Sequence, residues 1–181
     1  MRTNLFFRFH RSIVGSSLKA FAKCLCPWVL VLTLLSCASQ QQRAERRART
    51  QQAVAEALAA RQLIISITSM SSARYGTRTV SFGFNLEVKG DTLVSYLPYV
   101  GRVYRSSVLS TPIGLNFEAP ILAFQESRPK GNRTRLDLRV KTIEDVYDYV
   151  IEVYDSGKAT IFVRGQYRDA ISFDGDVVTD E

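Results

Sequence analysis

Apolar and polar residues alternate through most of the chain after residue 62, which is the pattern of half-buried β-strands. The clearest alternation covers ten residues, from Thr79 to Val88. A strand with this period places every second side chain on the same face. We therefore expect one continuous strand here, with its apolar face turned into the domain. That candidate interior face consists of Val80, Phe82, Phe84, Leu86 and Val88.

The same period returns in later segments, with turn residues between them. Residues 89–92 (Lys-Gly-Asp-Thr) and 155–158 (Asp-Ser-Gly-Lys) are expected hairpin turns. Between these turns, Tyr147, Tyr149, Ile151 and Val153 are expected to share one strand face. The expected strands, eight to ten in all, lie in residues 64–68, 79–88, 93–97, 102–109, 113–118, 121–125, 135–141, 147–153, 159–164 and 169–174.

Short strands at this regular spacing are typical of an all-β antiparallel fold. Apolar faces opposite charged faces indicate a sheet with one wetted side. We expect residues 62–181 to form a small up-and-down, lipocalin-like barrel, closed or partly open. A two-sheet β-sandwich is the alternative.

The segment before the strands has a helical pattern. From Ala38 to Gln62 it contains neither Gly nor Pro and is rich in Ala, Arg, Gln and Glu. A helix is expected over residues 43–60, with a thin apolar stripe at Val54 and Leu58. We interpret residues 37–61 as a tether outside the β-domain. Arg43, Arg46, Arg47 and Arg49 against Glu45 give it a local charge of +3, suited either to an anionic membrane surface or to a solvated spacer.

Residues 1–36 have the layout of a bacterial export signal, with a basic, acid-free start and an apolar run over 27–35. The uncharged stretch 25–38 has 14 residues, fewer than the roughly 20 that a membrane-spanning helix needs. The ending Leu34-Leu35-Ser36-Cys37 resembles the lipobox of bacterial lipoproteins, in which the cysteine is acylated. Lipidation of Cys37 would then attach the protein to a membrane.

Removal of this signal changes the charge of the protein. The whole chain has 24 basic and 17 acidic residues, a net of +7, but five basic and no acidic residues precede Cys37. The remaining part has 19 basic and 17 acidic residues, a net of +2. No nucleic-acid partner is therefore expected.

The same removal excludes several kinds of catalysis. His10 is the only histidine, and Cys24 and Cys26 lie in the signal. No Ser-His-Asp triad, Cys-His dyad or His-containing zinc site can form in the rest of the chain. The acidic residues at 174–180 lack the ligand spacing of a calcium loop. We expect a protein that is not an enzyme, with no catalytic residue, metal site or cofactor.

One aromatic and basic group stands out near the middle of the chain. Pro98 must end or edge a strand because it lacks a backbone donor, and Gly101 permits a sharp turn after it. A candidate binding rim consists of Tyr96, Tyr99, Arg102, Tyr104 and Arg105. The alternative, which we favour, is a structural corner in which Arg102 satisfies backbone carbonyls.

Three strings resemble the domain of unknown function 4251 family of Bacteroidetes-type bacteria. They are residues 96–102 (Tyr-Leu-Pro-Tyr-Val-Gly-Arg), 155–161 (Asp-Ser-Gly-Lys-Ala-Thr-Ile) and 168–175 (Arg-Asp-Ala-Ile-Ser-Phe-Asp-Gly). The resemblance covers about residues 63–178 and implies an all-β domain behind a lipoprotein signal. It implies no activity and transfers no catalytic residue. The chain departs from the family pattern at Val100, where an aromatic is expected, and at Asp169, where an amide or a basic residue is commoner.

These observations lead to two hypotheses on function. The first is a lipid-anchored, non-enzymatic binding protein of the cell envelope that holds an apolar small molecule or a lipid. The second is a structural or accessory subunit of an outer-membrane protein complex, with no ligand cavity. The polar, acid-free residues 38–43 after Cys37 favour the periplasmic face of the outer membrane over the cell surface.

Overall fold

The computed structural model describes residues 40–81, 83–104 and 114–179. The expected lipidation site Cys37, the core candidate Phe82 and the rim candidate Arg105 lie outside these residues. The chain divides into two units, residues 1–46 and 47–181. Residues 40–59 are helical, and the second unit holds all nine described strands. No helix in the described ranges is both long enough and apolar enough to cross a membrane.

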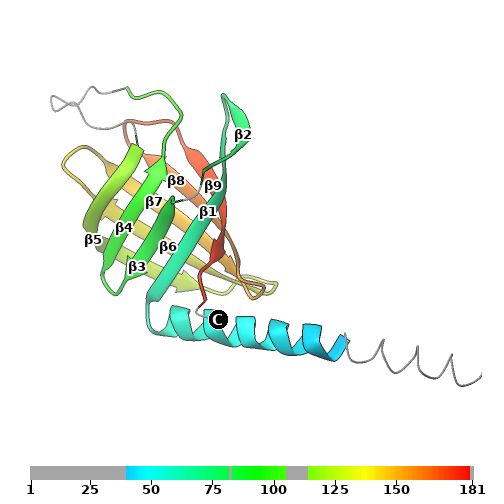
Figure 1. Cartoon of the computed structure of the whole chain (residues 1–181). Coiled ribbons are helices and arrows are strands. Elements are labelled where there is room, and N and C mark those ends of the chain that lie inside the picture. The colour runs from blue at the N-terminus through cyan, green and yellow to red at the C-terminus, as the bar shows by residue number, and fades with distance from the viewer. Residues whose placement is uncertain (1–39, 82, 105–113, 180–181) are drawn as a thin grey trace, which may run out of the picture. The chain divides into compact units, whose positions relative to one another are not determined.

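Eight antiparallel strands close into a barrel, and a ninth short strand extends one part of its wall (Figure 1). The strands are β1 (Gln62–Ser72), β2 (Gly76–Thr79), β3 (Asn85–Lys89), β4 (Thr92–Pro98), β5 (Gly114–Ser127), β6 (Arg133–Lys141), β7 (Val146–Tyr154), β8 (Lys158–Gly165) and β9 (Ile171–Val177).

The strands follow one another around the wall in chain order, apart from β2. The long β1 closes the barrel because its first half pairs with β3 while most of its length pairs with β9. The short β2 pairs with the last four residues of β1. The expected up-and-down antiparallel barrel is therefore confirmed, and the sandwich alternative is not adopted.

Alternate residues of each strand fill the interior. On β7, Tyr147, Tyr149, Ile151 and Val153 are all at most 2% exposed, which confirms that they share the buried face. Leu86 and Val88 of the candidate interior face are likewise in the core. The interior of an eight-stranded barrel is just wide enough for side chains to fill or for one small ligand.

Residues 47–59 of the helix pack into the core, whereas the sequence pattern predicted a tether outside the β-domain. Val54 and Leu58, one turn apart, are 2% and 8% exposed and belong to the same apolar cluster as the strands. The methyl group of Thr50 faces Gly157 in the β7–β8 turn. Two residues after the helix, Arg61 has a φ of 52°, the left-handed conformation common just beyond helix C-termini. The boundary expected at residues 61 and 62 therefore separates residues that pack together.

The expected continuous strand over 79–88 is wrong, because the chain leaves strand geometry between β2 and β3. Gly83 has a φ of 105°, a value that favours glycine. Phe84 is only partly buried and stacks on the outward ring of Tyr96, with ring centroids 5.3 Å apart. Val80 is also only partly buried. Both flanking strands still pair with β1, so the interruption is a bulge in one long partner of β1.

Two further strand expectations need correction. The described part of the segment 113–118, which begins at Gly114, and the segment 121–125 are not separate strands but parts of β5, whose register with β6 shifts between Ile121 and Ala123. Pro120 fits there because it needs no donor at a strand irregularity. The expected strand 102–109 is reduced, within the described residues, to one bridge between Val103 and Arg168.

Candidate functional site at the loop end of the barrel

The two ends of the barrel differ in what covers them. The first, here called the helix end, carries residues 47–59 of the helix and the turns at 90–91, 128–132 and 155–157. The second, here called the loop end, carries the turns 73–75, 142–145 and 166–170 and the segment 99–104 after β4. All but one of the expected rim residues that the structure describes lie in the segment 99–104 at the loop end.

Asp169 holds the segment after β4 against the β8–β9 turn. One carboxylate oxygen accepts a hydrogen bond from the Tyr104 hydroxyl at 2.6 Å, and the other accepts one from the Arg102 backbone N–H at 3.1 Å. The Asp169 N–H donates to the Arg102 carbonyl at 3.1 Å. The Tyr99 hydroxyl also donates toward this carbonyl, at 2.9 Å. The result is a closed polar corner between two segments far apart in sequence.

Gly101 is required at this corner for space rather than for an unusual backbone angle. A Cβ at this position would lie 2.5 Å from the Tyr99 hydroxyl oxygen and 3.3 Å from Asp169 Cβ. Any larger residue would therefore push Tyr99 out of its buried position. The sequence interpretation of Gly101 as a turn residue identified the position but not this reason.

Beneath the corner lies an ion pair that the sequence did not reveal. The Arg168 guanidinium donates to Glu144 at 2.6 Å and to the Gly114 carbonyl at 3.3 Å. The Arg168 side chain is only 11% exposed. Its guanidinium lies 5.4 Å from the ring centre of Tyr99 and 6.0 Å from that of Tyr147. This arrangement neutralises the cation and covers it with aromatic faces.

Asp145 closes the adjacent β6–β7 turn. It is 5% exposed, and its carboxylate accepts backbone hydrogen bonds from Val146 at 2.7 Å, Gln166 at 3.0 Å and Tyr167 at 3.1 Å. These three donors satisfy a buried charge that would otherwise be costly. The carboxylate therefore joins the β6–β7 turn to the β8–β9 turn.

The electrostatics of the corner follow from these contacts. Burial raises the pKa of Tyr99 to about 12 and that of Tyr147 to about 12. The hydrogen bond from Tyr104 lowers the pKa of Asp169 and raises the pKa of the Tyr104 hydroxyl. Near neutral pH, Tyr99 and Tyr104 are therefore neutral hydrogen-bond donors and Asp169 is a charged acceptor.

The structure brings together three of the expected rim residues and separates a fourth. Tyr99, Arg102 and Tyr104 lie around Asp169. Tyr99 is buried, and Arg102 contacts the Asp169 carboxylate through its backbone N–H rather than through its side chain. Tyr96 lies on the outer wall of β4, where it is 48% exposed. The geometry is that of a structural corner, with Tyr104 exposed at its edge.

The barrel interior below the loop end is aromatic. The rings of Phe117 and Tyr147 stack with centroids 5.2 Å apart, and Tyr149 meets both rings edge-on at 6.4 Å. The Tyr149 hydroxyl donates to the Ser95 hydroxyl at 3.3 Å, and Ser95 donates to the Leu115 carbonyl at 2.6 Å. The polar atoms inside the barrel thus bond to one another.

Neither of two hollows in the described structure opens into this interior. One is an open depression on the outer face of β6–β9, beside Val150 and Phe162, with an empty volume of about 730 Å³ that includes open solvent. The other lies at the rim between the β1–β2 hairpin and Val100 and is too tight to admit the centre of a water-sized sphere. In the described residues, no group of three or more His, Cys, Asp or Glu side chains is placed to hold a metal ion.

Comparison with known proteins assigns this fold to a family. A family model named "Domain of unknown function (DUF4251)" matches residues 45–177. The chain belongs to the DUF4251 family. A crystal structure of a DUF4251 family protein from Bacteroides eggerthii DSM 20697 is similar, with a TM-score of 0.56 and 11% identity over 73% of this chain and 89% of that one. No curated protein matches the chain. The DUF4251 match begins inside the helix, in agreement with the packing of Val54 and Leu58 into the barrel.

Proposed function

We propose that this DUF4251 protein is a non-enzymatic barrel that acts through its outer surface, as a structural or accessory subunit of an outer-membrane protein complex. The observation that carries the proposal is the filled interior. Phe117, Tyr147 and Tyr149 contact one another in the space where a lipocalin-like barrel would hold a ligand.

The polar groups of the loop end support the same conclusion. Arg168 is paired with Glu144, and the Asp145 carboxylate is occupied by three backbone donors. A general acid, base or nucleophile has to reach its substrate. Here these groups bond to neighbouring parts of the same barrel, which supports a role in stability.

Attachment to the envelope is part of the proposal. Its support is the sequence ending in Cys37, together with the expected export signal over residues 1–36. Acylation of Cys37 would place the barrel at the outer membrane, and the acid-free residues after it favour the periplasmic face. The membrane partner is therefore proposed to be engaged through Cys37.

Native mass spectrometry of the protein extracted from its own membranes tests the filled interior. We expect the mass of the chain with its acyl modification alone. The variant Tyr149→Ala should lose about 3–5 kcal/mol of unfolding free energy, because it leaves a cavity in a packed core. Phe162→Ala, on the outer wall, is the control and should lose much less, since Phe162 is 42% exposed.

The competing hypothesis of a ligand carrier gives a different result. A lipid-sized mass in fixed proportion to the protein, lost in Tyr149→Ala with little change in stability, would contradict the proposal. That outcome would mean that the barrel opens to hold an apolar molecule.

A further inference from the structure

The strand β2 has a partner on only one side. Its four residues are exposed, and it pairs with β1 between Ser69 and Ser72. The strand β4 pairs with β3 from Thr92 to Tyr96 and with β5 along its whole length. Among the described residues, the second edge of β2, here called the open edge, therefore has no strand partner (Figure 1).

The register shows which backbone groups point to the open edge. The Val80 N–H donates to the Thr68 carbonyl at 3.1 Å, so these two residues form a bonded pair. Bonded and non-bonded pairs alternate in an antiparallel ladder. Arg78 therefore bonds to β1, whereas the N–H and C=O groups of Thr77 and Thr79 point away from it. This is the geometry that an added strand requires.

The surroundings of the open edge are positively charged. Arg74, Arg78 and Arg102 have no ion pair with another residue of the described structure, although eight other pairs are present. The guanidinium groups of Arg74 and Arg78 lie 5.9 and 5.8 Å from the ring centre of Tyr75. The positive charges of Arg74 and Arg102 also contribute to the lowered pKa of Asp169, which places them in the same neighbourhood.

Asp169 offsets only part of this positive charge. Both of its carboxylate oxygens already accept hydrogen bonds from the polar corner. Three arginines against one aspartate leave a local charge of +2. Tyr75 and Tyr104 add exposed aromatic surface, at 45% and 66% exposure.

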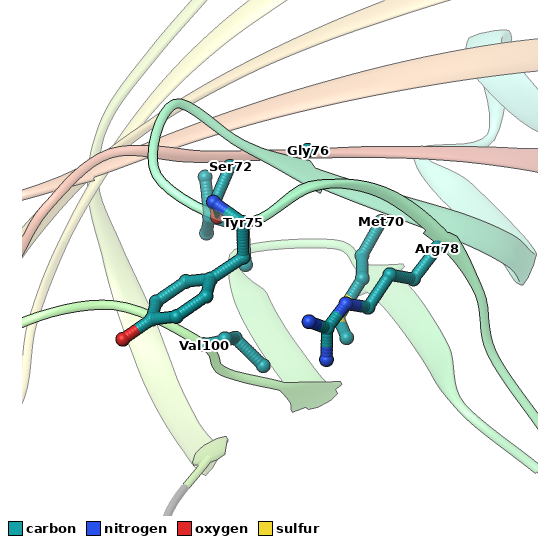
Figure 2. Close-up of a pocket in the computed structure, with 7 residues that line it drawn as sticks. Met70, Ser72, Tyr75, Gly76, Arg78 and Val100 are labelled. Carbon is teal, nitrogen blue, oxygen red and sulfur yellow. Dashed lines mark hydrogen bonds between the residues drawn. The ribbon is translucent and has the colours of Figure 1, made fainter.

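A narrow hollow lies beside the open edge. It is bounded by Met70, Tyr75, Arg78 and Val100, and Figure 2 shows the side chains of Tyr75 and Arg78 extending from the β1–β2 hairpin on one side of it. It has no room for the centre of a water-sized sphere, so it is a crease in the surface rather than a site for a free ligand.

We propose that the open edge of β2 binds an extended, acidic segment of a partner protein, which adds to β2 as a further strand. Backbone groups of Thr77 and Thr79 would pair with the segment, and Arg74, Arg78 and Arg102 would attract its carboxylates. A second copy of the same edge is disfavoured, because it would bring like charges together. A short edge strand with a charged residue at its centre resists pairing with arbitrary strands. We therefore expect the positive charge around β2 to select an acidic partner segment. This inference rests on the proposed function, since it names the surface through which the barrel acts.

Amide hydrogen exchange of the full chain in neutral detergent tests this inference directly. The probe is an acetylated peptide of about six residues that alternates Thr and Glu, compared with a Thr–Lys peptide of equal length. We expect the acidic peptide to slow exchange at Thr77 and Thr79, and the basic peptide to leave both unchanged. Thr77→Pro should prevent this protection without breaking the β1–β2 pairing, because the Thr77 N–H points away from β1.

A charge-reversal pair supplies the matched control. The double variant Arg74→Glu/Arg78→Glu should weaken binding of the acidic peptide about tenfold or more. Arg128→Glu/Lys130→Glu changes the net charge equally at the helix end and should leave binding unchanged.

Three results would overturn the inference: no slowed exchange at Thr77 and Thr79 with the acidic peptide, equal weakening by both double variants, or protection by anionic lipid vesicles but not by the peptide. Each of these leaves the filled interior intact, as judged by native mass spectrometry. A co-purifying lipid would instead contradict the proposed function and would not alter the exchange result.

Discussion

Shortening either of two apolar side chains of the helix should destabilise the whole barrel. Val54 and Leu58 are 2% and 8% exposed, and both belong to the core cluster. Truncation of a buried leucine to alanine costs about 2–5 kcal/mol, and a site at the end of a barrel can partly relax. We therefore expect Leu58→Ala to lower the unfolding free energy by about 2–3 kcal/mol. Small domains have about 5–15 kcal/mol in total, so this loss is large.

Substitution by alanine makes the result of this experiment simple to interpret. It is the best helix former, so any loss reports packing rather than helix propensity. Urea denaturation of the full chain, followed by far-ultraviolet circular dichroism, gives the midpoint and slope for each variant. Gln51→Ala, at an exposed position of the same helix, is the control. A chain that lacks residues 47–59 should be less stable than one that begins at residue 47.

Equal midpoints for Leu58→Ala and Gln51→Ala would refute the reasoning. They would show that the helix merely rests on the barrel, and that residues 62–181 fold independently, as the sequence pattern alone indicates.

Three other regions give shorter predictions. Asp145→Ala should cost about 3 kcal/mol or more in urea denaturation, because three buried N–H donors lose a charged acceptor. Asp155→Ala should cost little, because the partly exposed Asp155 side chain has no hydrogen-bond partner among the described residues. Burial raises the pKa of Tyr147 from 10.0 to about 12, so its neutral form stabilises the fold below pH 10 and this contribution is lost as the pH rises toward 12. Tyr147→Phe should therefore flatten the alkaline part of the stability curve. Cys37→Ser should abolish metabolic palmitate labelling and release the protein from membranes; equal labelling of both chains would contradict the proposed anchor.

The fold class was predictable because a barrel wall with one buried face forces a period of two. On β6 and β7 the alternation is unbroken, and the buried residues follow it one by one. The interruption before β3 escaped this reasoning, because the bulge keeps the alternation of apolar and polar letters while turning the chain. Gly83 within a strand pattern was the available signal, since an isolated glycine there indicates a bulge.

The helix was misinterpreted for a different reason. Val54 and Leu58 form a stripe too thin to distinguish a solvated spacer from a plug. The deciding factor is the tertiary packing of these two side chains into the apolar cluster of the strands. Such a fit depends on tertiary structure and has no counterpart in the local pattern.

The polar corner was predictable in part. Tyr99, Arg102 and Tyr104 are close in sequence, and the resemblance to the family directed attention to them. Their common partner Asp169 lies 67 residues beyond Arg102, and no local rule connects the two. The departure from the family pattern at Asp169 was the one signal that this residue has a particular role here. The pairing of Arg168 with Glu144, which are 24 residues apart, had no such signal.

The arginines that have no ion pair point to a function once the other charges of the loop end have been given a structural role. Arg168 is neutralised by Glu144, and Asp145 and Asp169 are satisfied by neighbouring donors. An exposed arginine without a partner adds little to stability, so stability does not explain why three of them gather at the open edge of β2. Like charges held close together oppose folding slightly and favour the approach of an anion. Under the proposed function the barrel acts through its outer surface, and this edge combines free backbone groups, aromatic surface and positive charge. We therefore propose β2 as the surface that meets the partner.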